Sequence, residues 1–241
     1  MIDTAKIKDF WDARGKKFGC SPSEEMANLE ADPELLALKI KLEQEAVLPR
    51  LNLGPDMDVL DLGAGYGQWA FRFAPRVRSV TAVEFSLPML ESGIAEAKRR
   101  ALSNVSFVHC AAEDFTPYRL WPLVFISGLF MYLNDIQAER VAKRAVESLA
   151  PGGRIFLRES VSLIGKRYSI DDRWSQAAQA NYSALYRMPE EFEDIFAGLG
   201  LRPLEHGNMF PDGCRLNKWS ETRLRFYVFE KPETTHAREL G

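Results

Sequence analysis

The chain has 241 residues, of which 46% are hydrophobic and 27% are charged, and its formal net charge is −3. This length suits one α/β domain with a sizeable core, and the nearly balanced charge disfavours nucleic acid as a partner. No apolar run is long enough to predict a membrane span, and the first residues lack the apolar core of a secretory signal.

Three cysteines, Cys20, Cys110 and Cys214, stand far apart without a C-x-x-C pair. We therefore expect neither a metal site nor a disulfide framework, and we expect a cytoplasmic location.

The N-terminal part of the chain predicts helices. Phe10, Trp11 and Phe18 lie in a charged segment that predicts an amphipathic helix, which either packs on the core or covers a binding site as a lid. Asp32 and Pro33 favour the cap and the first turn of a further helix.

Residues 58–67, DVLDLGAGYG, predict a short buried strand, an acid and a glycine-rich turn. Asp61 ends the strand, and Gly63, Gly65 and Gly67 let the backbone turn sharply and approach a ligand. Such a turn before a helix is the first half of a nucleotide-binding βαβ unit. The G-x-G-x-G spacing differs from the G-x-G-x-x-G of dinucleotide enzymes, and the acid suits an amino-acid-like group better than a pyrophosphate.

Residues 59–67 resemble, at every position, the first motif of the class I S-adenosylmethionine-dependent methyltransferases. The resemblance implies a Rossmann-like α/β fold: a seven-stranded, mostly parallel sheet with its last strand antiparallel, and helices on both faces. It also implies S-adenosyl-L-methionine as cofactor and S-adenosyl-L-homocysteine as product. The alternatives are a tight turn in another α/β protein and a nicotinamide dehydrogenase, which the glycine spacing disfavours.

The second predicted strand, residues 79–86, carries the acid Glu84 at its carboxyl end. A carboxylate there can accept two hydrogen bonds from a ribose diol, and the resemblance implies the same role. Phe85 adjoins it, and Met89 in the next predicted helix packs either near the adenine or in the core.

The third predicted strand, residues 105–109, precedes the loop that the resemblance places against the adenine. In that loop Ala112 and Glu113 match the family pattern, whereas Cys110 and Ala111 depart from it.

The apolar run within residues 120–133 predicts a central parallel strand. The resemblance places Ser127 and Gly128, at its end, beside the methionine part of the cofactor. Residues 154–160 predict the fifth strand, after a Pro-Gly-Gly turn that is frequent in the family. The chain has no Asn/Asp-Pro-Pro-Tyr motif, which disfavours nucleobases and release factors as acceptors.

Residues 201–206 and 221–230 predict the last two strands, and the resemblance implies that the final one inserts antiparallel between its neighbours. Residues 161–188 are the least family-like stretch. They predict either the wall of an acceptor pocket or a solvated helical hairpin.

We therefore expect the chain to divide into an N-terminal helical lid or cap, 1–53, a methyltransferase domain, 54–231, and a tail, 232–241. The acceptor-pocket insertion, 161–188, lies within the domain.

Two sets of side chains are candidates for the site. The cofactor-binding set is Asp61, Gly63, Ala64, Gly65, Gly67, Glu84, Phe85, Met89, Ala112, Glu113, Ser127 and Gly128. The acceptor set is Trp11, Phe18, Tyr132, Tyr168, Trp174, Tyr186 and Arg187. His206 and Tyr132 are the candidates for a catalytic base.

The expected function is transfer of a methyl group to O or N of a small-molecule acceptor by in-line displacement. Because the cofactor brings its own leaving group, the protein mainly aligns the reactants, and a base is needed only when the acceptor must lose a proton early. The alternatives are a protein or peptide methyltransferase and a non-catalytic S-adenosylmethionine-binding module. The sequence leaves the oligomeric state open.

Overall fold

A central seven-stranded sheet organises the computed structural model, which describes residues 2–19, 24–28 and 30–233. Cys20 and residues 234–241 of the expected tail lie outside the described residues. The strands are β1 (Asp58–Leu62), β2 (Ser79–Glu84), β3 (Val105–His109), β4 (Trp121–Ser127), β5 (Leu149–Ser162), β8 (Arg202–Asn208) and β9 (Thr222–Glu230).

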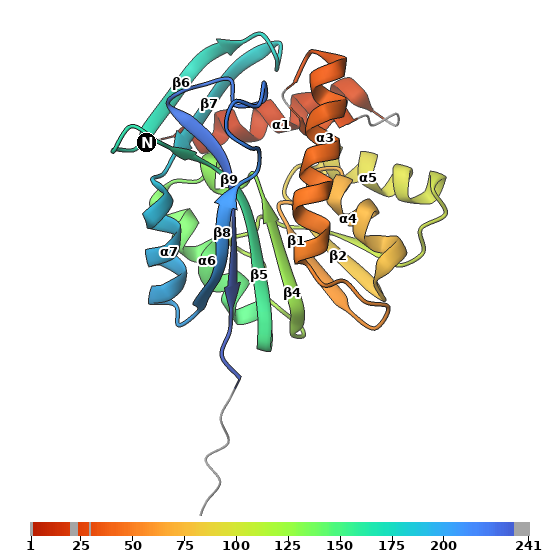
Figure 1. The fold of residues 1–241 in the computed structure, drawn as a ribbon. Helices are drawn as coiled ribbons and strands as arrows, with labels where there is room; N and C mark the ends of the chain where they lie inside the picture. Colours follow the sequence, from red (N-terminus) through yellow and green to blue (C-terminus); the bar gives the residue numbers. More distant parts are fainter. Residues whose placement is uncertain (1, 20–23, 29, 234–241) are drawn as a thin grey trace, which may run out of the picture.

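The strand order is β3-β2-β1-β4-β5-β9-β8 (Figure 1). Strands β1 to β5 pair in parallel, whereas β9 runs antiparallel to both β5 and β8. The expected Rossmann-like fold, with a mostly parallel sheet and an antiparallel last strand, is therefore confirmed.

Helices cover both faces of the sheet (Figure 1). They are α1 (Thr4–Phe18), α2 (Glu24–Ala27), α3 (Pro33–Val47), α4 (Gln68–Phe73), α5 (Leu87–Arg99), α6 (Asp135–Ser148) and α7 (Pro189–Gly198), with short 3₁₀ turns η1 (Leu48–Arg50), η2 (Ala74–Arg76) and η3 (Phe130–Tyr132). The side chain of Asp32 accepts hydrogen bonds from the amides of Glu34 and Leu35, and therefore caps α3 as its residue type predicts.

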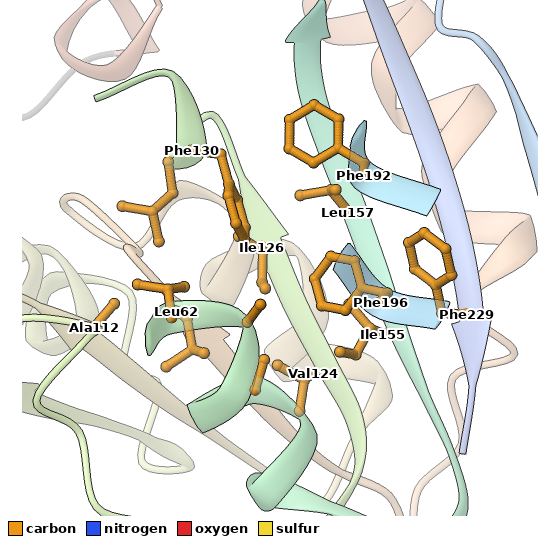
Figure 2. Close-up of a cluster of buried hydrophobic side chains, with 14 of the residues drawn as sticks. Leu62, Ala112, Val124, Ile126, Phe130, Ile155, Leu157, Phe192, Phe196 and Phe229 are labelled. Carbon is orange, nitrogen blue, oxygen red and sulfur yellow. The ribbon is translucent and has the colours of Figure 1, made fainter. Parts of the chain in front are cut away.

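Alternating strand residues divide the core into two layers, because successive side chains of a strand point to opposite faces. Leu62, Ile126 and Leu157 pack with Phe192 and Phe196 of α7, as Figure 2 shows. Val59, Phe125 and Phe156 instead pack with side chains of α3 and α4. Burial on both faces explains the near-continuous apolar runs of these strands.

The expected insertion at 161–188 forms two antiparallel strands, β6 (Tyr168–Ser175) and β7 (Ala180–Tyr186). The helical-hairpin alternative is therefore wrong. Apolar side chains of β7 alternate toward an aromatic cluster shared with α1 and η3, and this packing favours strand over helix.

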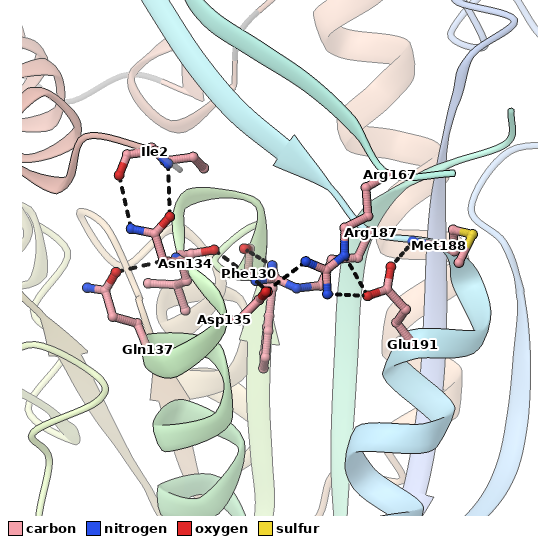
Figure 3. Close-up of polar contacts among 10 residues, drawn as sticks. Ile2, Phe130, Asn134, Asp135, Gln137, Arg167, Arg187, Met188 and Glu191 are labelled. Atoms are coloured by element: carbon pink, nitrogen blue, oxygen red, sulfur yellow. Dashed lines mark hydrogen bonds and ion pairs between the residues drawn. The ribbon is translucent and has the colours of Figure 1, made fainter. Parts of the chain in front are cut away.

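Helix α1 is docked on the body of the protein by polar and steric contacts. Asn134 both accepts from the amide of Ile2 (2.8 Å) and donates to its carbonyl (2.9 Å), as Figure 3 shows. The Ser86 hydroxyl donates to Asp12 (2.5 Å). Gly15 lies so close to α5 that an added Cβ would stand 2.7 Å from the Met89 amide nitrogen.

None of the helices within the described residues is long and apolar enough to cross a membrane.

Candidate cofactor and acceptor site

A cavity of about 1330 Å³ opens at the carboxyl ends of the central strands. Asp61 of β1, Glu84 of β2, Ser127 of β4 and Ser160 of β5 line its floor, and Trp11 of α1 lies in its cover. The first two crossovers run from β1 toward β3, whereas the next strand, β4, lies on the other side of β1. Ligands of open α/β sheets bind at such a point of reversal.

The glycine turn after β1 needs glycine for its backbone conformation. Gly63, Gly65 and Gly67 all have positive φ, at 74°, 59° and 89°. The amides of Gly63 and Ala64 donate to the carbonyl of Val83 (2.9 and 3.0 Å), which fixes the turn against β2. Gly67 caps α4 and does not line the cavity, whereas the other residues of the cofactor-binding set all do.

Glu84 holds the glycine turn through its carboxylate. Its Oε2 accepts from the amide of Gly65 and its Oε1 from the amide of Ser86, each at 2.8 Å. Burial of the side chain raises the pKa of Glu84 to about 7, although these backbone bonds favour the ionised form.

Asp61 is 2% exposed, and its Oδ2 has no hydrogen-bond partner among the described residues. Burial, and secondarily the charge of Glu84, raise the pKa of Asp61 to about 8. A buried carboxylate oxygen without a partner is costly, so this oxygen suits a positively charged ligand group.

The acceptor set divides into residues that line the cavity and residues that do not. Trp11, Tyr132, Tyr168, Trp174 and Tyr186 line it. The rings of Trp11 and Tyr132 meet edge to face, with centroids 5.3 Å apart.

Arg187 and Phe18 lie outside the cavity. Arg187 is 1% exposed and donates to the carbonyls of Phe130 (2.8 Å) and Leu133 (2.9 Å), which fixes the η3 turn (Figure 3). Phe18 packs in an apolar cluster that includes Met26 and Met89.

His206, a candidate catalytic base, lies on β8 away from the cavity. Its side chain is 55% exposed, and its Nδ1 lies 2.8 Å from Oε1 of Glu193. Tyr132 lines the cavity, but burial raises its pKa above the ordinary value, so the phenol stays neutral. No histidine lines the cavity within the described residues.

Sequence reasoning missed several lining residues. Tyr182 on β7 places its hydroxyl 3.4 Å from the hydroxyl of Tyr132, a contact between residues 50 positions apart that no local pattern predicts. Lys39 of α3 and Arg158 of β5 also line the cavity. A charged residue within an apolar strand is the signal that singles out Arg158.

Residues 59–153 match the family model described as "Methyltransferase domain". The chain therefore contains a methyltransferase domain, in the segment that carries the class I S-adenosylmethionine-dependent motif. Its fold is similar to that of DhpI, solved with S-adenosylhomocysteine (TM-score 0.63, 23% identity, covering 94% of this chain and 95% of that chain). It is also similar to phosphoethanolamine N-methyltransferase 2 of Haemonchus contortus (TM-score 0.62, 18% identity, covering 79% and 52%).

Curated relatives match over about half of this chain. Phosphoethanolamine N-methyltransferase 1 of Triticum aestivum is 33% identical over 124 residues, which are 50% of this chain and 24% of that protein. Chondramide synthase cmdD of Chondromyces crocatus is 32% identical over 128 residues, 51% of this chain and 3% of that protein. The chain therefore spans only a small part of these relatives.

The cofactor of the methyltransferase family is S-adenosylmethionine, and the residues present fit it. The unpartnered Oδ2 of Asp61 suits the ammonium of an amino-acid group, and the positive-φ glycines bring the backbone close to the cavity. Glu84, Ala112 and Glu113 line the part of the cavity at the ends of β2 and β3.

Proposed function

We propose that this methyltransferase moves a methyl group from S-adenosylmethionine to the nitrogen of a small-molecule amine. The observation that carries the proposal is the composition of the cavity. Its floor holds the residues that the sequence predicts to bind the cofactor, and its remaining wall holds aromatic rings from α1, η3 and the β6–β7 hairpin. Bound S-adenosylmethionine supplies both the methyl group and the leaving group.

The cover over the cavity favours a small acceptor. Helix α1 contributes Ile7, Lys8 and Trp11 to the lining, and its docking on α5 and on Asn134 holds it over the strand ends. We therefore propose that residues 1–53 act as a lid, and that the 161–188 insertion closes the acceptor side. A folded protein acceptor would need this cover to be displaced.

The lining favours nitrogen over oxygen as the methylated atom. Aromatic faces attract cations, and Trp11, Tyr132, Tyr182 and Tyr186 all contribute to the cavity wall. Burial raises the pKa of each of the three tyrosines, so they remain neutral phenols. An amine can lose its proton to solvent before attack, whereas an alcohol or phenol needs a base in the site.

Two kinds of relative bear on this choice. Several curated relatives are named phosphoethanolamine N-methyltransferases, which supports an amine acceptor. The tRNA 5-carboxymethoxyuridine methyltransferase of Escherichia coli has a nucleic-acid acceptor by name. It is 30% identical over 110 residues, which are 44% of this chain and 41% of that protein. The aromatic wall and the negative net charge favour the small amine here.

The test is transfer of tritiated methyl groups from S-adenosylmethionine into a cell extract, followed by separation of protein, nucleic acid and small molecules. We expect label in small molecules that a cation-exchange resin retains. Label in protein or nucleic acid would contradict the proposal, as would cofactor binding without transfer to any purified amine of a broad panel.

A matched pair of variants localises the acceptor. Tyr132→Ala removes a ring from the aromatic wall and should raise the KM for the amine while S-adenosylhomocysteine affinity stays unchanged. Tyr118→Ala removes a ring that is 66% exposed and does not line the cavity, so it should change neither constant.

A further inference from the structure

Two buried charged side chains hold the backbone of η3, one through its carbonyls and the other through its amides. Arg187 is 1% exposed, and its Nη1 and Nη2 donate to the carbonyls of Phe130 (2.8 Å) and Leu133 (2.9 Å) (Figure 3). Glu159 is 0% exposed, and its Oε2 accepts from the amides of Leu129 (3.0 Å) and Phe130 (2.8 Å). Hydrogen bonds to charged groups are stronger than those between neutral ones, so the turn is held firmly.

An ion pair orients the guanidinium of Arg187. Its Nη2 also donates to Oδ1 of Asp135, the first residue of α6 (2.9 Å), and Arg167 donates to Oδ2 of the same carboxylate (2.8 Å). The contact with Arg167 lowers the pKa of Asp135, so this carboxylate stays ionised and balances the buried cation. A planar guanidinium can reach two carbonyls and a carboxylate at once. A lysine has a single nitrogen on a flexible chain and cannot hold all three in one fixed geometry.

Arg187 also connects η3 to the β6–β7 hairpin. It follows Tyr186, the last residue of β7, and its carbonyl accepts from the amide of Ser162 at the end of β5 (2.8 Å). Tyr182 and Tyr186 of β7 line the cavity, as does Tyr132 of η3. The hydroxyls of Tyr132 and Tyr182 lie 3.4 Å apart. One residue therefore ties together the two elements that carry these tyrosines, through its side chain on one and its backbone on the other.

Arg187 itself does not line the cavity, so it has no direct contact with an acceptor there. We propose that Arg187 is a positioning residue for the methyl transfer, and that it acts through Tyr132. By joining η3 to β7 it sets the ring of Tyr132 against the tyrosines of the hairpin. The inference rests on the proposed function, in which these rings hold the amine. Placement matters here because a displacement of about 1 Å can cost about 100-fold in rate.

The placement of the Tyr132 ring can be measured without any acceptor. The rings of Trp11 and Tyr132 meet edge to face, so fluorine NMR of the full chain labelled with fluorotryptophan reports on Tyr132 through the Trp11 signal. The variant Trp11→Phe identifies that signal. We expect Arg187→Lys to shift it toward its position in Tyr132→Ala, and to leave the signal of Trp69, in the other layer of the core, unchanged. Arg167→Lys is the control, because Arg167 is 41% exposed and donates to carboxylates rather than to the backbone of η3.

A double-mutant cycle tests whether the effect passes through Tyr132. The rate of tritiated methyl transfer is measured against dilutions of the small-molecule fraction of the cell extract, which gives an apparent KM before the acceptor is identified. Arg187→Lys should raise this KM about 10-fold in the wild-type chain, within the range for coupled residues, and should raise it no further in Tyr132→Ala. A merely structural role would act in both backgrounds, so equal fold-changes would overturn the proposal.

A second variant keeps the proposal testable if Arg187→Lys does not fold. Asp135→Asn changes a side chain that is 54% exposed and leaves Arg187 without its ionic partner, so it should shift the Trp11 signal in the same sense by a smaller amount. A Trp11 signal at its wild-type position in every folded variant would overturn the proposal. Tritium in protein or nucleic acid, together with a shifted Trp11 signal, would contradict the proposed function alone.

Discussion

Replacing Glu84 by glutamine is the sharpest perturbation of the predicted ribose site. In the free protein each carboxylate oxygen accepts one backbone amide, from Gly65 and from Ser86. Glutamine keeps one oxygen and turns an NH₂ group toward the other amide, so one bond becomes a contact between two donors. We expect this to lower the free energy of unfolding by about 1–3 kcal/mol.

The cofactor should be affected as well. A carboxylate can accept from both hydroxyls of a ribose while it holds the glycine turn, whereas the amide has a single acceptor oxygen. The loss of one hydrogen bond to a charged group costs about 1.5–3 kcal/mol, or about 10- to 140-fold in Kd.

Calorimetry with S-adenosylhomocysteine and urea unfolding measure the two effects of Glu84→Gln separately. Glu91→Gln, an exposed change on neighbouring α5, is the control and should leave both quantities unchanged. Wild-type affinity in Glu84→Gln would refute the ribose role, even if the stability fell as expected.

Three further predictions follow from particular contacts. In Gly15→Ala the new methyl would stand 2.7 Å from the Met89 amide nitrogen, so hydrogen exchange should accelerate across α1; Gly198→Ala, with open space around it, should not change that exchange. Glu159→Ala removes the acceptor of two buried amides of the η3 turn, at 3.0 and 2.8 Å, and should lower the free energy of unfolding in urea by about 2–5 kcal/mol; a loss below about 1 kcal/mol would contradict this. Because burial raises the pKa of Asp61 from 3.8 to about 8, the free chain should lose stability as pH rises through this window. Binding the cofactor ammonium should then release a proton near pH 6.5, seen as a calorimetric enthalpy that depends on the buffer and is lost in Asp61→Asn.

The glycine turn beside the cavity could be predicted from the sequence because one contiguous segment builds it. Asp61 and the glycines that follow it act through local backbone geometry, which residue type and spacing specify directly. The central strands could also be predicted from the sequence, since a parallel strand buried on both faces must be apolar along its whole length.

The parts of the cavity wall that come from α3, β5 and the β6–β7 hairpin were harder to predict, because they depend on contacts between distant segments. Arg158 and Glu43 pair across 115 positions of sequence, and no local pattern specifies that pairing. The β6–β7 hairpin likewise gains its strand structure from packing Tyr182 and Tyr186 against η3 and α1. Tertiary packing of this kind overrides the local preferences on which the helical alternative depended.

The cavity has a floor at the ends of the central strands and an aromatic wall from other elements, and this division explains where acceptor specificity can vary. The family match covers 59–153, which holds Asp61, Glu84 and Ser127, but stops before the hairpin and excludes α1 and α3. Elements outside the matched segment thus supply most of the aromatic wall, while the matched segment contributes Tyr132. Substitutions in α1 or the hairpin can therefore change the acceptor without disturbing the cofactor floor. The acceptor of a relative can therefore be assigned to this chain only where that relative has residues equivalent to Trp11, Tyr182 and Tyr186.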